Sequence, residues 1–338
     1  MKTTQKIMSF GSITRTVLVK RNSQPASVPP LNTWLVFEPD SSYITFSIKG
    51  RNLMRKLIAI FSLFVLFALA PQQARAVVIQ IKGSDTMVNL GQAWAEEFMN
   101  KHPEVSIAVT GGGSGTGIAA LINGTTAIAQ SSRDMKPEEK AEVEKATGKP
   151  VKEFKTALDA LAVIVNPANP VSELSFDQLS DIFTGKIKNW KEVGGKDELI
   201  LILSRERNSG THVYFLEHVL RKGDAKGPEE FDSSVLMMPS SQAIAQEVAR
   251  SGAAIGYLGI GYVTQAHKTL AVKKSASEAA VTPSAEAAQS GQYPISRWLY
   301  IYTAGDPEGP VKEFIDFAMS AEGQQIVAAM DFVPLPKT

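Results

Sequence analysis

The chain has 338 residues, which is enough for one large domain or two of ordinary size, and its 44% hydrophobic and 20% charged residues are typical of a globular protein. Lys and Arg number 35 against 34 Asp and Glu, so no basic excess indicates nucleic-acid binding. The absence of cysteine excludes disulfides, thiol nucleophiles, Cys-ligated metals and a lipid anchor on cysteine. With four scattered histidines, we expect neither a metal nor a cofactor.

A secretory signal peptide is predicted over residues 54–76. Arg55 and Lys56 follow Met54, residues 57–70 form an uncharged apolar run, and Ala74-Arg75-Ala76 has the pattern of a cleavage site. The run is too short for a membrane span, which needs about 20 apolar residues. We expect cleavage after Ala76 and release into the periplasm. Residues 1–53 are then a non-native extension, with a genuine N-terminal extension as the alternative.

From residue 77 the chain alternates between predicted strands and helices, as in an α/β fold with mainly parallel sheets. In the first half, β-branched or apolar runs predict strands, and apolar residues at helical spacing predict the helices between them. The strands are expected at 77–81, 105–109, 127–129 and 160–165, with helices at 87–98 and 118–122.

The second half begins at the breaker cluster 166–170, where we expect the chain to cross into another domain. Ser175 and Gln178 have capping-box spacing and predict a helix start, and Pro310 predicts another. The segment 275–290 is compatible with either helix or loop. The remaining strands are expected at 199–203, 253–257 and 298–302, and the remaining helices at 213–220, 244–248 and 310–319.

Four polar loops follow predicted strands, and three of them lead directly into a helix. Strand carboxyl ends and helix N-termini are where open α/β sheets bind ligands, and helix N-termini attract anions. Hydroxyls, glycines and arginines together indicate a tetrahedral anion. The alternative for any single loop is that its Ser or Thr is only a helix cap. The loops are Gly83–Thr86, Gly111–Gly117, Ser131–Arg133 and Arg205–Thr211.

Residues 77–338 resemble the periplasmic phosphate-binding protein family of phosphate ABC transporters. The resemblance rests on the GSDT, GGGSGTG, SSR and RERNSGTH loops, on SFDQLSDIFTGKIKNW at 175–190, on AAIGYLG at 253–259 and on FVPLP at 332–336. It implies a two-lobed fold of the type II periplasmic-binding-protein class, with the ligand in the cleft between lobes. It also implies a non-enzymatic, monomeric protein that captures inorganic phosphate and delivers it to membrane ABC permease subunits.

The expected lobes are 77–164 with 264–338, and 165–263, with the chain crossing between them near Val163–Asn166 and near Val263–Ala271. Carried over position by position, the resemblance implies ligand-binding roles for residues of all four loops. These are Ser84, Asp85, Thr86, Ser114, Gly115, Ser132, Arg133, Arg205, Ser209, Gly210 and Thr211. No catalytic residue and no metal ligand is implied.

The position after Ser132 departs from the family pattern. Well-known members have an Asp there, which accepts the proton of hydrogen phosphate and repels sulfate, whereas this chain has Arg133. Asp85 or Asp134 could replace that acceptor, or both could be ordinary solvated carboxylates. An alternative function is the binding of sulfate, molybdate or another oxyanion. A further alternative is a phosphatase-like hydrolase that uses Ser114 or Ser209 as a nucleophile, which needs an adjacent base such as His212.

Overall fold

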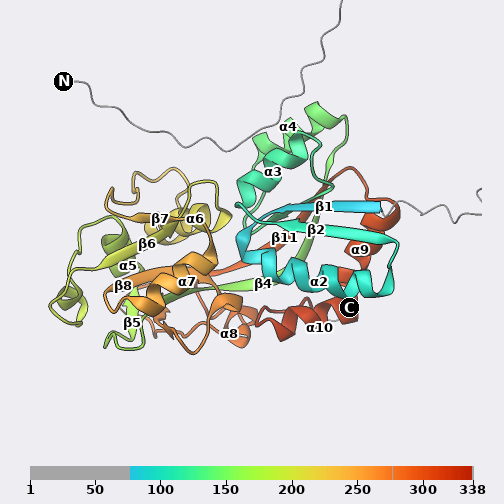
Figure 1. Ribbon diagram of the computed structural model, residues 1–338. Coiled ribbons are helices and arrows are strands. Elements are labelled where there is room, and N and C mark those ends of the chain that lie inside the picture. The colour runs from blue at the N-terminus through green and yellow to red at the C-terminus, as the bar shows by residue number, and fades with distance from the viewer. Residues whose placement is uncertain (1–76, 276, 337–338) are drawn as a thin grey trace, which may run out of the picture. The chain divides into compact units, whose positions relative to one another are not determined.

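Figure 1 shows the computed structural model, which describes residues 77–275 and 277–336. The predicted signal peptide and the extension before it lie outside the described residues. In the part of the chain that is described, no helix combines the length and the apolar character needed to cross a membrane.

The main sheet has the strand order β2-β1-β3-β11-β4-β8-β6-β7, with β9 paired to β4 beside this path. Its two ends are parallel, because β1 pairs with β2 and β3, and β6 pairs with β7 and β8. Its middle is antiparallel, because β4 pairs with β11, β8 and β9, and β11 pairs with β3. The strands are β1 (Val77–Gly83), β2 (Val105–Thr110), β3 (Ile128–Ser131), β4 (Val151–Val165), β6 (Leu201–Arg205), β7 (Leu236–Met238), β8 (Ala254–Gly259), β9 (Lys268–Thr269) and β11 (Ser296–Ala304), and β5 (Glu173–Ser175) pairs with β10 (Ala271–Lys273) in a second sheet.

The helices that hydrophobic periodicity predicts are present, but the helices at Pro137–Thr147 and Ala321–Ala329 were not predicted. The predicted capping box is present, since the Ser175 hydroxyl accepts the Gln178 N–H, and Pro310 lies in the first turn of α9. The segment 275–290, for which the sequence was compatible with helix or loop, contains a short helix near its end. The α-helices are α2 (Val88–Lys101), α3 (Ser114–Ile122), α4 (Pro137–Thr147), α5 (Phe176–Phe183), α6 (Gly210–Phe215), α7 (Ser241–Arg250), α8 (Ala285–Gln289), α9 (Gly309–Met319) and α10 (Ala321–Ala329), with the short helical turns η1 (Asp85–Met87), η2 (Trp190–Val193), η3 (Leu216–Leu220) and η4 (Ile260–Tyr262).

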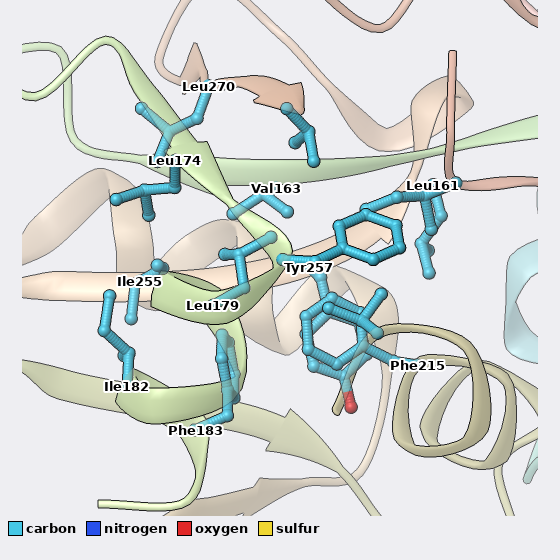
Figure 2. Close-up of a cluster of buried hydrophobic side chains, with 14 of the residues drawn as sticks. Leu161, Val163, Leu174, Leu179, Ile182, Phe183, Phe215, Ile255, Tyr257 and Leu270 are labelled. Atoms are coloured by element: carbon cyan, nitrogen blue, oxygen red, sulfur yellow. The ribbon is translucent and has the colours of Figure 1, made fainter. Parts of the chain in front are cut away.

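Strand β4 connects two lobes, each with its own hydrophobic core. The first part of β4, residues 151–160, runs along β11 with one register shift, and its last five residues pair with β8. The first lobe contains β1–β3, β11, α2–α4, α9 and α10, which lie on one side in Figure 1, and the second contains β5–β8, α5, α6 and α7. Buried side chains such as Ile81, Leu90 and Phe314 fill the first lobe. Leu179, Phe183, Phe215 and Tyr257 are among those that fill the second, and Figure 2 shows them together.

The second crossing between lobes differs from the prediction. Leu270 and Val272, which were assigned to the first lobe, are buried in the same cluster as Leu174 (Figure 2 labels Leu270 and Leu174). Strand β10 also pairs with β5, and the short β9 pairs with the end of β4. The chain therefore stays with the second lobe until β11, because the apolar residues of 268–295 find their partners there.

A candidate anion-binding site between the two lobes

The predicted loops come together where strands of both lobes end. In the first lobe, Ser84 follows β1, Ser114 begins α3 and Ser132 follows β3. In the second lobe, Arg205 ends β6 and Ser209 caps α6. Glycine makes the close approach possible: Gly83 has φ +145°, and a Cβ atom there would lie 2.0 Å from the Gln130 carbonyl oxygen.

Five hydroxyl groups form a buried cluster that spans the lobes. Ser84 Oγ donates to Ser132 Oγ at 2.8 Å, and Ser114 Oγ accepts the Ser132 N–H at 3.0 Å. From the second lobe, Thr211 Oγ1 lies 3.0 Å from Thr86 Oγ1 and 3.5 Å from Ser132 Oγ. All five residues are buried, so their donors face one another and not bulk water. Such a cluster of convergent hydroxyls suits an anion with several oxygens.

Arg205 adds a buried positive charge, with its residue only 1% exposed. Its Nη2 forms an ion pair with Asp85 of the first lobe and also donates to the Pro239 carbonyl at 3.0 Å. Its Nη1 donates to Ser241 Oγ at 3.2 Å. The other Asp85 oxygen, Oδ1, accepts the Gly112 N–H at 3.2 Å. The pair therefore links the glycine-rich loop to the second lobe.

The remaining loop residues lie where the two lobes approach each other. Ser209 Oγ accepts the N–H groups of Thr211 and His212 as a helix cap. A Cβ atom on Gly210 would lie 2.3 Å from Ser114 Oγ, so only glycine allows this contact between lobes. Gly115 donates its N–H to the Asn208 carbonyl at 2.9 Å and therefore belongs to the rim of the site.

Arg133 does not join the hydroxyl cluster through its guanidinium. Nη1 donates to Glu139 Oε2 at 2.8 Å, and Nη2 donates to Glu139 Oε1 at 2.6 Å. Burial tends to raise the pKa of Glu139, but the bonds from Arg133 and from the Lys136 N–H outweigh it and hold that pKa below its usual value. The charge of Arg133 is thus neutralised at the start of α4, which does not fit the expected ligand role.

The two carboxylates considered as proton acceptors lie in different surroundings. Asp85 is buried beside Arg205, whereas Asp134 is exposed. The structure therefore brings Asp85 into the site and leaves Asp134 at the surface.

The imidazole that a hydrolase would need as a base contacts a different serine, Ser204. His212 Nδ1 lies 3.2 Å from Ser204 Oγ, and its ring stacks on Phe231. Burial lowers the pKa of His212 to about 4, so the imidazole is neutral at pH 7. This arrangement gives no support to nucleophilic catalysis by Ser114 or Ser209.

One buried ion pair next to the cluster was not predicted from the sequence. Arg297 on β11 donates to Asp159 Oδ2 from Nε at 3.1 Å and from Nη2 at 2.9 Å. Nη2 also donates to Thr86 Oγ1 at 3.2 Å. Both residues lie within strands, outside any glycine-rich or Ser-rich loop. The one signal was a charged residue directly before each of two predicted apolar strands, at 160–165 and 298–302.

Asn208, a residue at the rim, was not predicted from the sequence either. Asn208 donates from Nδ2 to the Gly112 carbonyl at 2.8 Å and to Thr116 Oγ1 at 3.1 Å. Its position one residue before Ser209 placed it within a predicted loop, but nothing in the sequence indicated its partner in the other lobe.

Together, the site presents hydroxyl and guanidinium donors from two lobes. Within the described ranges, no three His, Asp or Glu side chains are grouped so that they could hold a metal ion. This geometry is that of a two-lobed binding protein whose convergent donors suit a small tetrahedral anion.

Comparisons with known proteins agree with this class. The family model described as the PBP superfamily domain matches residues 70–322. The phosphate-binding protein PstS of Pseudomonas aeruginosa is 35% identical over 270 residues, covering 75% of this chain and 82% of the relative. The phosphate-binding protein PstS of Bacillus subtilis is 36% identical over 258 residues, covering 76% and 80%.

A solved structure has the same fold. The putative phosphate ABC transporter substrate-binding protein of Clostridium perfringens, with bound phosphate, is 34% identical with a TM-score of 0.68 and covers 77% of this chain and all of its own. The chain belongs to the PBP superfamily and, within it, to the family of the PstS phosphate-binding proteins.

Proposed function

We propose that this protein binds inorganic phosphate between its two lobes and delivers it to the permease of an ABC transporter. The observation that carries the proposal is the convergence of five buried hydroxyl groups and Arg205 from both lobes. The names of the relatives support phosphate as the anion. The protein acts as a binding protein and not as an enzyme.

The proposed ligands are the hydroxyls of Ser84, Thr86, Ser114, Ser132 and Thr211, with Arg205 as the cation. Ser209 and Gly210 contribute the N-terminal turn of α6, whose N–H groups and dipole favour an anion. Gly115 contributes to the rim. Arg133 is proposed to stabilise the first turn of α4 through Glu139 and not to bind the ligand.

Asp85 is proposed as the acceptor of the proton that hydrogen phosphate carries near neutral pH. It is the carboxylate that lies among the proposed ligands, and its partner Arg205 is itself one of them. A carboxylate accepts a hydrogen bond from the O–H group of hydrogen phosphate but repels sulfate, which has no such donor at that pH. The geometry therefore favours phosphate over sulfate and molybdate.

Phosphate is proposed to act by a shift between open and closed arrangements of the lobes. Ligands come from both lobes, so the complete set exists only when the lobes meet. Because the anion binds the closed form more tightly than the open form, it shifts the equilibrium toward the closed form. The chain crosses between lobes within β4 and before β11, so we propose lobes of 77–160 with 296–336, and 161–295.

The proposed location is the periplasm, reached through the cleaved signal peptide over residues 54–76. A monomer is sufficient for this function, because both halves of the site come from one chain. The permease subunits are the proposed membrane partners.

Calorimetry of the purified protein against phosphate, sulfate and molybdate tests the proposal. We expect phosphate binding that survives an excess of sulfate. Arg205→Ala should weaken it by about 3–5 kcal/mol, roughly 10²–10⁴-fold, because a buried charge is left without its partner. Asp85→Asn combined with Arg205→Ala separates the loss of the cation from the effect of the unpaired carboxylate. Retained tight binding in both variants would refute the site.

A further inference from the structure

Arg297 is a buried cation next to the proposed phosphate ligands. Its side chain is 2% exposed and pairs with Asp159, which is fully buried. Asp159 Oδ1 accepts the Ile260 N–H at 3.1 Å, so the carboxylate is held in place from both sides. The Arg297 guanidinium lies 5.5 Å from the ring centre of Tyr214, a residue of α6 in the second lobe. Arg297 therefore contacts both lobes where they meet.

The Arg297 guanidinium makes more hydrogen bonds than its ion pair with Asp159 requires. Asp159 Oδ2 takes bonds from Nε and Nη2, and Nη2 adds a third bond to the hydroxyl of Thr86. The remaining nitrogen, Nη1, is buried and has no hydrogen-bond partner among the described residues. A guanidinium that served only to neutralise Asp159 would not need a contact with a proposed phosphate ligand.

The contact determines which way the Thr86 hydroxyl donates. A guanidinium has only donors, so Thr86 Oγ1 must accept from Arg297. The hydroxyl has a single proton, which is then free for the far side, where Thr211 Oγ1 lies at 3.0 Å. We propose that Arg297 is a positioning residue that orients the Thr86 hydroxyl as a donor into the phosphate site. This inference rests on the proposed function.

The orientation of the Thr86 hydroxyl decides whether its contact with the anion is attractive or repulsive. With Arg297 in place, Thr86 offers a proton to an anion oxygen. Without it, the hydroxyl can rotate and offer a lone pair, which repels the anion. The effect of Arg297 on phosphate binding must therefore pass through the Thr86 hydroxyl.

A double-mutant cycle tests this dependence. One arm combines Asp159→Asn with Arg297→Met, which removes both charges together and keeps an acceptor for the Ile260 N–H. The other arm is Thr86→Val, which removes the hydroxyl but keeps the shape. Calorimetry with inorganic phosphate gives the affinity of the wild-type protein, each arm and their combination, and thermal unfolding without phosphate checks that each protein folds.

We expect the charge-removing arm to weaken phosphate binding roughly tenfold in the wild-type background and less than about twofold in the Thr86→Val background. The same arm combined with Ser114→Ala is the control. It should remain additive, because the Ser114 hydroxyl bonds to Ser132 and not to Thr86.

Equal losses in the two Thr86 backgrounds, or no loss in either, would overturn the inference, because Arg297 would then act only on the general structure. Should the charge-removing arm not fold, Arg297→Lys takes its place. Its ammonium compensates Asp159 but cannot hold the planar pair of contacts. Failure of the wild-type protein to bind phosphate would instead overturn the proposed function and this inference together.

Discussion

Replacing Asp85 by asparagine should change which anions the protein accepts. One Asp85 oxygen accepts from Arg205 and the other accepts from the Gly112 N–H, so the side chain is fixed within the glycine-rich loop. Asparagine has nearly the same shape but exchanges one acceptor oxygen for a donating amide. In the proposed site this exchange removes the acceptor for the phosphate proton and adds a donor for an oxyanion without a proton.

The expected loss of phosphate affinity follows from the removal of one hydrogen bond with a charged group. Such a bond contributes about 1.5–3 kcal/mol, so phosphate affinity should fall roughly 10- to 100-fold. Sulfate should gain, because the repulsion from the carboxylate is gone. Release of Arg205 from its ion pair acts on both anions alike, so the phosphate-to-sulfate affinity ratio isolates the role of the proton acceptor.

Competition calorimetry measures that ratio directly. Phosphate is titrated into the wild-type and Asp85→Asn proteins, with and without a large excess of sulfate. The matched control is Asp134→Asn, the same chemical change at an exposed carboxylate a few residues from Ser132. We expect the control to leave the ratio unchanged. An unchanged ratio in Asp85→Asn, or a shift of similar size in the control, would refute the assignment of Asp85 as the acceptor.

Three further variants test other parts of the site. Arg133→Gln should lower the free energy of unfolding in urea by about 1–3 kcal/mol and leave phosphate affinity within about twofold; a large loss of affinity would show that Arg133 contacts the ligand after all. Asn208→Ala removes two bonds that cross the lobes, to Gly112 and Thr116, so phosphate should dissociate about tenfold faster in stopped-flow measurements, and an unchanged rate would contradict a role in closure. His212 has a pKa of about 4 in the folded protein against an ordinary 6.5, so as the pH falls the unfolded chain takes up a proton before the folded protein does. Protonation therefore favours unfolding between pH 6.5 and pH 4. Over this range the wild-type protein should lose about 3 kcal/mol more free energy of unfolding than His212→Gln.

The local structure could be predicted from the sequence because it depends on neighbouring residues. The Ser175 capping box, the first-turn Pro310 and the apolar strand at 160–165 each carry their signal within a few positions. The path between lobes could not be predicted in the same way. Leu270 and Val272 are ordinary apolar residues, and only their packing against the second-lobe core shows to which lobe they belong.

The site shows the same division between local and distant information. Ser84, Ser114 and Ser132 could be selected because strand ends, glycines and hydroxyls occur together in their loops. The role of Arg133 could not, because it depends on Glu139 lying on the first turn of the next helix. Arg297 and Asp159 are far apart in sequence, and neither is near a loop that resembles a ligand site. Their pairing depends on the register between β4 and β11, which a single sequence does not specify.

The placement of charge explains how closure can depend on the anion. Each buried cation of the site has its own carboxylate, Asp85 for Arg205 and Asp159 for Arg297, so the charged side chains cancel in pairs. The Asp85–Arg205 pair has one member in each lobe, so in the proposed opening the pair separates and each charge gains exposure to water. The desolvation cost of a buried pair is close to its attraction, so this pair alone gives little preference for the closed arrangement. The contacts of the anion with the surrounding hydroxyls can then decide the equilibrium, and release follows once those contacts are lost.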